Sequence, residues 1–226
     1  MCGRYTLYSE KGEIEEIFNV QSDEDDLFQS NYNVTPGTIN PVILMPRPNV
    51  RDIAGFKWGL IPSWADDQRI GYKMINARSE TLLEKSSFHK PFQRQRCIVP
   101  ANGFYEWQTI YKQKTPFYVR TLDQNLLGFA GLYEIWESKD KKEVIYSYTI
   151  ITTEANALLQ PLHDRMPVIL EKKNYDHWLD PVNSNTDDLL SLLKPYPTER
   201  MAIYRVSQDV NEARNNGPEL IQPVDA

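Results

Sequence analysis

Short apolar runs, separated by turn-forming or charged residues, make up most of the hydrophobic pattern of this chain. The runs are rich in Val, Ile, Tyr, Phe and Trp, which are the residues that pack well on a pleated sheet. We therefore expect β-strands over residues 41–45, 53–60, 97–107, 116–121, 126–136, 144–152, 166–170 and 201–206.

A second pattern, apolar residues at helical spacing, predicts helices over residues 11–20, 75–85, 172–181 and 186–195. In the first of these, Ile14, Ile17 and Phe18 share one face. The second begins as an extended stretch before it turns helical. In the last, Thr186 is the expected N-cap and Pro195 follows the end.

The expected strands outnumber the expected helices and do not alternate with them. That arrangement is typical of an α+β fold rather than of a parallel α/β sheet. We expect a single domain over residues 1–226, built on a mostly antiparallel, curled and barrel-like sheet that is flanked by helices.

Composition narrows the class of protein further. Hydrophobic residues make up 41% of the chain and aromatic residues 12%, as in globular proteins. No apolar run approaches the roughly 18 residues that span a bilayer, and the first residues lack the layout of a signal peptide. With only 2 cysteines in the chain, a disulfide framework is not expected, and the pattern indicates a cytoplasmic protein.

The charge balance bears on possible partners. The net charge is -6 and the pI about 5.2, which argues against indiscriminate binding to nucleic acid, because a basic pI is the usual sign of it. Part of the acidic excess lies in the run "SDEDD" at 22–26, which we expect to be a solvated loop. These numbers still allow a local basic cleft.

The chain begins "MCGRYTL", and Cys2 is the first candidate for chemistry. Removal of Met1 would leave Cys2 with both a free α-amine and a thiol. An α-amine has a pKa of about 7.7–8.0, against about 10.4 for lysine, so much more of it is neutral near pH 7. Such an amine can attack an aldehyde to form an imine, on which the thiolate closes a thiazolidine ring. The alternative is a structurally idle cysteine.

Other polar residues stand in contexts that suggest chemistry. Glu106 lies inside the aromatic run "ANGFYEW", either on a solvent face or part-buried with a shifted pKa. His163, in "QPLHDRMPV", is flanked by an acid and a base in a loop expected between a helix and a strand, and a packed or solvated histidine is equally open. Asn76 and Arg78 stand two apart in "INARSE", so an extended segment would aim both side chains to one side.

Rigid apolar residues and the remaining cysteine and histidines complete the set. For Trp64 and Pro36, packing beneath a loop and stacking on exposed DNA bases are both open. We expect Cys97 to be a small buried hydrophobe, and His89 and His177 to be surface residues. No CxxC or HxxxH pattern occurs, so we expect no metal site and no cofactor.

Taken together, several stretches resemble a known family, the SOS-response-associated peptidase (SRAP) family of abasic-site processing proteins. They occur in the family order and run from the first residue to the last few: "MCGRYTL", "YNVTPG", "WGLIPSW", "INARSET", "ANGFYEW", "LHDRMPV" and "NNGPELIQPV". One departure stands out, because the segment 63–78 is longer and more polar than the family pattern leads us to expect.

The resemblance implies a function for the N-terminal cysteine. Members of the family bind single-stranded DNA that contains an abasic site and link this cysteine to the ring-opened sugar as a thiazolidine, which shields the lesion during the SOS response. On this chain the nucleophile would be Cys2, exposed as the terminus once Met1 is removed. We expect the protein to act as a monomer, associated with the nucleoid when bound to DNA.

The resemblance also implies roles for other residues. Asn76 matches an asparagine that helps to hold the opened sugar, Glu106 an acid that moves protons during imine formation, and His163 a histidine that acts on the sugar ring. The implied DNA contacts are phosphate contacts by Arg4, Arg78 and Arg165, and a wedge made by Pro36 and Trp64.

Rival hypotheses share some of these features. N-terminal-nucleophile hydrolases, such as class II glutamine amidotransferases, also begin with Met-Cys-Gly; there the thiol attacks an amide and the amine serves as base. A non-covalent single-strand binding module would keep the arginines and aromatics without depending on Cys2. Autocatalytic removal of Met1, a peptidase activity, is compatible with the main hypothesis.

Overall fold

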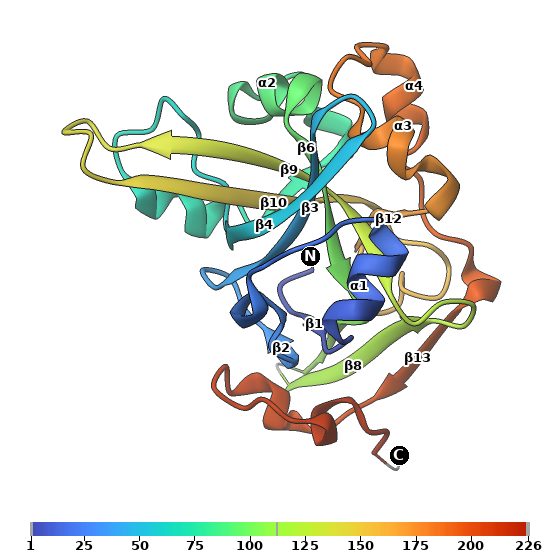
Figure 1. Ribbon diagram of the computed structural model, residues 1–226. Helices are drawn as coiled ribbons and strands as arrows, with labels where there is room; N and C mark the ends of the chain where they lie inside the picture. The colour runs from blue at the N-terminus through green and yellow to red at the C-terminus, as the bar shows by residue number, and fades with distance from the viewer. Residues whose placement is uncertain (1, 112, 225–226) are drawn as a thin grey trace.

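The computed structural model describes residues 2–111 and 113–224, and five of its strands form a closed barrel (Figure 1). The barrel strands pair in the order β10, β4, β3, β6, β9. The last strand, β9, also pairs with the first, β10, which closes the ring. All of these pairs are antiparallel except β10–β4. The barrel strands are β3 (Ile39–Arg47), β4 (Val50–Trp58), β6 (Arg96–Ala101), β9 (Leu127–Glu137) and β10 (Val144–Glu154).

Short strands attach to the rim of the barrel, and a second sheet lies below it in Figure 1. The rim strands are β5 (Asn76–Arg78), β11 (Arg165–Pro167) and β12 (Ile169–Leu170). The second sheet has five strands in the order β13, β8, β7, β1, β2. Its strands are β1 (Tyr5–Leu7), β2 (Asn31–Val34), β7 (Gly103–Ile110), β8 (Gln113–Thr121) and β13 (Met201–Arg205).

Helices surround the sheets, and three of them lie together at one end of the barrel (Figure 1). The α-helices are α1 (Lys11–Phe18), α2 (Ser86–Arg94), α3 (Tyr175–Leu179) and α4 (Thr186–Ser191). The 3-10 helices are η1 (Asp25–Phe28), η2 (Gln68–Lys73), η3 (Ser79–Thr81), η4 (Lys172–Asn174), η5 (Thr198–Arg200), η6 (Gln208–Asn211) and η7 (Pro218–Ile221). Among the described residues, no helix is long and apolar enough to cross a membrane.

The first strand joins the two sheets and thereby fixes the N-terminal segment. Tyr5 pairs with Phe104 of β7 in the five-stranded sheet, while its side chain is fully buried against the barrel. The Tyr5 ring packs edge-on against Trp58 at 5.1 Å, and its hydroxyl lies 2.8 Å from that of Tyr148. Aromatic pairs of this kind contribute beyond their buried area. Cys2 therefore precedes a strand that is anchored in the core.

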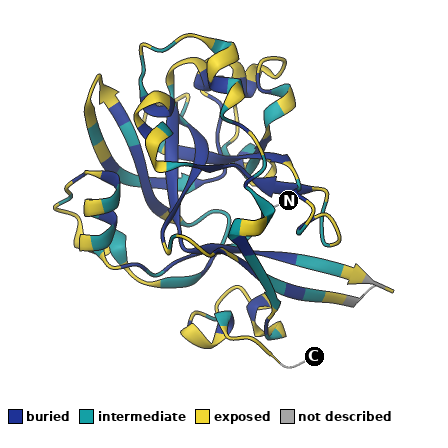
Figure 2. Cartoon of the chain, turned by 90° about the vertical axis from the view of Figure 1, so that its right-hand side faces the viewer, coloured by how far each residue is buried: buried dark blue, intermediate teal, exposed yellow. Residues whose placement is uncertain are grey.

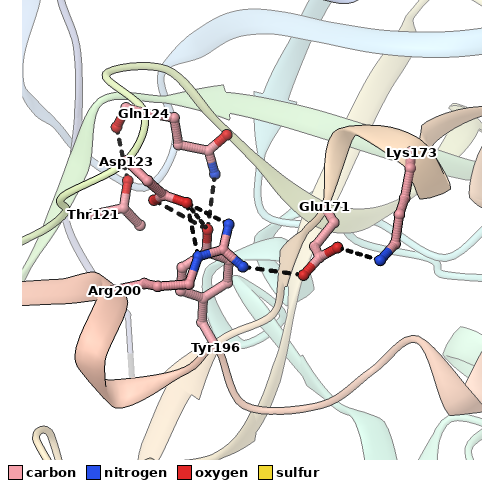
Figure 3. A network of polar contacts seen from close by, with 7 residues as sticks. All are labelled: Thr121, Asp123, Gln124, Glu171, Lys173, Tyr196 and Arg200. Carbon is pink, nitrogen blue, oxygen red and sulfur yellow. Dashed lines mark hydrogen bonds and ion pairs between the residues drawn. The ribbon is translucent and has the colours of Figure 1, made fainter.

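A network of polar and charged residues joins the sheets and is shown in Figure 3. Arg200, at the end of η5, forms ion pairs with Asp123 of the β8–β9 turn and with Glu171 after β12. The guanidinium also lies over the Tyr196 ring at 4.6 Å from the centroid, and Lys173 pairs with Glu171 at 2.7 Å. Because these side chains are partly exposed, water and salt weaken the pairs.

The structure confirms the α+β fold and all of the strands expected from apolar runs, but two of the runs each form two strands. The run 166–170 is divided between β11 and β12, which pair with β10 and β9 respectively. The run 97–107 forms two strands, β6 and β7, that meet at Asn102. The Asn102 side chain accepts hydrogen bonds from the backbone N–H groups of Tyr8 and Ser9, at 2.7 and 3.1 Å. The chain must turn there to reach the second sheet. Buried positions concentrate in the strands (Figure 2).

The extended start expected for the segment 75–85 is confirmed as β5, but the helix expected after it is wrong. The segment instead forms strand β5, the short η3 and a turn, and α2 begins only at Ser86. Parallel pairing with β10 explains the difference, because Ala77 aligns with Ile151 and is fully buried. Sheet pairing thus overrides the helical spacing.

Other helix expectations are close to the structure. The helices over 11–20, 172–181 and 186–195 are confirmed in shorter form as α1, α3 and α4. The N-cap of α4 is Asn185 rather than Thr186, since the Asn185 side chain accepts from the N–H of Asp188. No helix precedes the loop of His163, where residues 157–162 form turns.

Candidate active site

Cys2 lies immediately before β1 and is completely buried. Its thiol donates a weak hydrogen bond to the carbonyl oxygen of Arg4, at 3.7 Å. Burial raises the pKa of the Cys2 thiol far above its ordinary value, and the nearby negative charge of Glu106 raises it further. In this arrangement the sulfur carries its proton at neutral pH, so a nucleophilic thiolate requires a neighbouring group that accepts the proton.

Asn76 is the residue that contacts the Cys2 backbone. Parallel pairing of β5 with β10 aligns Asn76 with Ile150, and the side-chain Nδ2 donates to the carbonyl oxygen of Cys2 at 2.8 Å. The Oδ1 atom of the same amide is buried and has no hydrogen-bond partner among the described residues. A buried acceptor without a donor is costly, so this atom is suited to receive a donor from a bound molecule.

Glu106 enters the site from β7, where it aligns with Phe117 of β8. Its side chain is almost fully buried, with 2% of the residue exposed. Burial raises the pKa of Glu106 to about 7. Of the two interpretations drawn from the sequence, the buried carboxyl with a shifted pKa is confirmed. A group with this pKa can both accept and return a proton near neutrality.

His163 lies in the turn before β11, with 32% of its side chain exposed. Two groups compete for its Nδ1 atom: the backbone N–H of Arg165 donates to it at 3.0 Å, and Oδ1 of Asp164 lies 2.8 Å away. The first contact favours the neutral ring, and the second favours the protonated ring. Desolvation lowers the pKa of His163, whereas the charge of Asp164 opposes that shift. The neutral ring therefore prevails at neutral pH.

The three candidate phosphate-binding arginines have different environments. Arg78 is exposed and forms no ion pair with a described residue. Arg165 is 8% exposed, and its guanidinium forms a two-bond ion pair with Glu80, at 2.7 and 2.9 Å. Arg4 donates to Oδ1 of Asn33 at 2.7 Å and to the carbonyl of Val210 at 2.8 Å. Of the three, only Arg78 has a guanidinium without a hydrogen-bond or ion-pair partner among the described residues.

The two predicted wedge residues occupy turns. Pro36 is half-buried in the turn between β2 and β3. Trp64 follows β4 and is 57% exposed, so packing beneath a loop is ruled out for this side chain. An exposed indole of this kind is available for contact with another molecule.

The residues expected to have no chemical role are also accounted for. Cys97 is fully buried, and His89 and His177 are exposed, as expected. The acidic run 22–26 is largely exposed, and Asp25 pairs with Lys11 at 2.7 Å. Within the described ranges, no group of three or more His, Cys, Asp or Glu residues could hold a metal ion.

Sequence reasoning missed two acidic residues that support the site, Glu80 and Asp164. Both lie inside the motifs already noted, "INARSET" and "LHDRMPV". The nearness of Asp164 to His163 in the sequence was a usable signal. The pairing of Glu80 with Arg165 spans 85 residues, and nothing local in the sequence indicates it.

Comparison with known proteins assigns the chain to a family. The family model described as SOS response associated peptidase (SRAP) matches residues 1–213, and the protein belongs to this family. A Bacillus subtilis (strain 168) relative, named abasic site processing protein YoqW, is 48% identical over 98% of this chain and 99% of its own. The Xenopus tropicalis abasic site processing protein HMCES is 34% identical over 91% of this chain and 70% of its own.

The fold is also that of a solved structure. A crystal structure of a protein from Bacteroides thetaiotaomicron superposes with a TM-score of 0.90 at 30% identity, covering 99% of this chain and 100% of that one. The barrel and the attached five-stranded sheet are therefore shared with an experimentally determined relative.

Proposed function

We propose that this protein processes abasic sites in DNA by forming a covalent link between Cys2 and the ring-opened sugar of the lesion. The family assignment and the names of the relatives support DNA-lesion processing. The observation that carries the chemistry is the contact of Asn76 with the Cys2 carbonyl at 2.8 Å, beside a carboxyl whose charge raises the pKa of the Cys2 thiol.

The proposed reaction begins after Met1 is removed, which leaves the α-amine on Cys2 itself. The amine nitrogen attacks the aldehyde carbon and forms a C–N bond. The resulting hydroxyl leaves as water, which breaks a C–O bond and gives an imine. The thiolate sulfur then adds to the imine carbon, and the nitrogen takes a proton to complete a thiazolidine. One water is released, and no atom is oxidised or reduced.

Glu106 is the proposed proton carrier for these steps. With a pKa raised to about 7 by burial, it can accept a proton from the amine or thiol and return one to the departing hydroxyl. His163 is proposed to exchange a proton with the ring oxygen of the closed sugar, which opens it to the aldehyde. Asn76 holds the Cys2 carbonyl and offers its free Oδ1 to a sugar hydroxyl.

Single-stranded DNA, bound by a monomer in the cytoplasm or nucleoid, is the proposed partner. An abasic site has no base to read, so the aldehyde and the backbone must supply recognition. Arg78 is the first candidate for a phosphate contact because it is exposed and the part of the chain that the structure describes offers its guanidinium no ion pair. Arg165 and Arg4 would have to exchange Glu80 and Asn33 for phosphate. Pro36 and Trp64 are proposed to support the bent strand.

Two assays separate this proposal from its rivals. A denaturing gel of the protein with an abasic oligonucleotide should show a band of linked protein and DNA, and an oligonucleotide without the lesion should not. An amidotransferase would hydrolyse glutamine and give no such band, and a non-covalent binding module would bind both strands without linkage. The absence of a linked band from protein that lacks Met1 would refute the proposal.

A further inference from the structure

A pocket of ≈ 320 Å³ lies between η2 and the end of β4. We call it the η2 pocket and define it by Gly37, Lys57, Gly59, Gly71 and Tyr72, which line it. Part of its lining, including Gly71 and Tyr72, comes from the segment 63–78, which is longer and more polar than the family pattern. Its volume lies at the lower end of the range of small-molecule sites.

Two glycines bring together the elements that line the η2 pocket. A Cβ at Gly59 would lie 2.7 Å from the carbonyl oxygen of Gly71, and one at Gly71 would lie 2.6 Å from that of Gly59. Gly59 also has a φ of +123°, a conformation that residues with side chains rarely adopt. The two glycines therefore let the end of β4 and η2 approach closely.

An exposed aromatic ring forms one wall. Tyr72 is 66% exposed, and its Cε1 atom lies 3.5 Å from where a Cβ of Gly37 would be. The ring thus reaches from η2 to Gly37 in the β2–β3 turn. A ring with this exposure can stack on a planar ligand, because stacking requires access to the ring face.

The charge at the pocket suits an anionic ligand. Lys57 lines it and forms no ion pair with a described residue. Arg69 is held by Asp67 at 2.6 Å, so its charge is already balanced. A planar group next to an unpaired ammonium is the recognition pattern for a nucleotide in a single strand.

The η2 pocket is linked to the candidate active site through a short stretch of chain. Tyr72 precedes Asn76 by four residues, which limits their Cα separation to about 14 Å. The indole N–H of Trp58, which also lines the pocket, donates to the carbonyl of Ile75 at 2.9 Å. A strand held at Cys2 is therefore within reach of the pocket one or a few nucleotides away.

From these observations we infer that the η2 pocket binds one nucleobase of the strand beside the lesion, by stacking on Tyr72, with Lys57 facing the adjoining phosphate. The inference rests on the proposed function, since it takes the ligand to be the same DNA strand. It adds a base-binding site that neither the reaction at Cys2 nor the predicted wedge requires.

The test measures non-covalent binding in a Cys2→Ala background, so that linkage does not interfere. Oligonucleotides carry an unreactive tetrahydrofuran abasic analogue at the lesion and a second one at each flanking position in turn. Loss of one base should weaken binding by roughly 5- to 150-fold at a single position, as expected for one stacked base. Tyr72→Ala should weaken binding of the singly modified strand by a similar factor and remove the dependence on that position.

Two further variants make the result specific. Tyr72→Phe should bind as the parent does, because stacking needs the ring and not the hydroxyl. The matched control is Tyr111→Ala, at a tyrosine that is 99% exposed in the β7–β8 turn, and it should leave binding unchanged. The inference is overturned if Tyr72→Ala binds like the parent. It is also overturned if removal of a base weakens binding by the parent and by Tyr72→Ala equally at every position.

A parallel assay keeps this inference separate from the proposed function. Protein with Cys2 intact and Met1 removed is mixed with a reactive abasic strand. If linkage occurs and Tyr72→Ala leaves binding unchanged, the inference about the η2 pocket is refuted and the proposed reaction is not. Absence of linkage refutes the proposed reaction, and the position dependence in the Cys2→Ala background then still decides whether the pocket binds a base.

Discussion

The side-chain amide of Asn76 donates a hydrogen bond of 2.8 Å to the backbone carbonyl of Cys2, 74 residues earlier in the chain. The carbonyl carbon, the amine and the side chain of Cys2 all branch from one Cα. A bond that fixes the carbonyl therefore restricts the directions in which the amine and the thiol can point. Asn76 itself is held by the pairing of β5 with β10, so the barrel determines the geometry of the N-terminus.

Replacing Asn76 by alanine should slow covalent linkage more than it weakens DNA binding. Loss of one hydrogen bond that orients a reacting group costs about 1–3 kcal/mol, which corresponds to a roughly 5- to 150-fold lower rate. The rate is measured by quenched gel assays at saturating DNA. Asn185→Ala, which removes the N-cap bond of α4, is the matched control and should leave the rate unchanged. Equal rates for Asn76→Ala and the parent would contradict this role.

The buried carboxyl of Glu106 should make stability depend on pH in a defined window. The unfolded chain releases the Glu106 proton near its ordinary pKa of 4.5, whereas the folded chain holds it up to about pH 7. The stabilisation from this group is therefore complete below pH 4.5 and is lost as the pH rises to 7, by up to about 3 kcal/mol.

Glu106→Gln removes this titration, so its stability relative to the wild type should improve between pH 5 and pH 8. Urea unfolding at the two pH values measures the difference. Glu137→Gln, on an exposed position of β9, is the matched control. Glu106→Gln should also slow linkage roughly 10²- to 10⁴-fold, because the proton carrier is gone. A stability difference that does not change with pH would show that Glu106 is charged in the folded protein.

His163 should be needed for opening the sugar and not for the later steps. His163→Ala should slow linkage to a closed abasic sugar roughly 10²- to 10⁴-fold and slow linkage to a simple acyclic aldehyde far less. The two rates are compared on oligonucleotides of the same sequence. Equal losses on both substrates would refute the ring-opening role, and no loss on either would make His163 a structural residue.

Arg78 and Arg165 should respond differently to substitution. Arg78→Ala should weaken binding to any single strand and reduce the slope of log K against log salt by about 0.7, the value for one phosphate contact. Arg165→Ala should instead lower the free energy of unfolding by about 1–3 kcal/mol, because Glu80 and the Thr152 carbonyl lose their donor. An unchanged salt slope for Arg78→Ala would show that the DNA path lies elsewhere.

Elements with their own apolar run could be predicted from the sequence, and elements defined by distant partners could not. The barrel strands β3, β4, β9 and β10 each contain such a run. The missed strands β1 and β2 have only 3 and 4 residues. Their extended form depends on pairing with strands far away in the chain. That pairing cannot be deduced from their own short sequences.

The candidate site shows the same division. Glu106 could be singled out because a charge inside an aromatic strand is unusual, but its burial depends on where β7 packs. Arg4 and Arg165 carry the same charge as Arg78, yet their protein partners lie 29 and 85 residues away. Residue type and motif therefore identified the candidates, and only the fold shows which guanidinium is free.

The central claim is that Cys2 forms a covalent bond with an abasic sugar, and intact-mass measurement tests it most directly. Protein without Met1 is incubated with an abasic oligonucleotide, heated and weighed beside Cys2→Ala. We predict a species with the mass of the protein plus the oligonucleotide minus one water, formed by the parent and absent from Cys2→Ala. The same species in Cys2→Ala, or its absence from the parent, would contradict the claim.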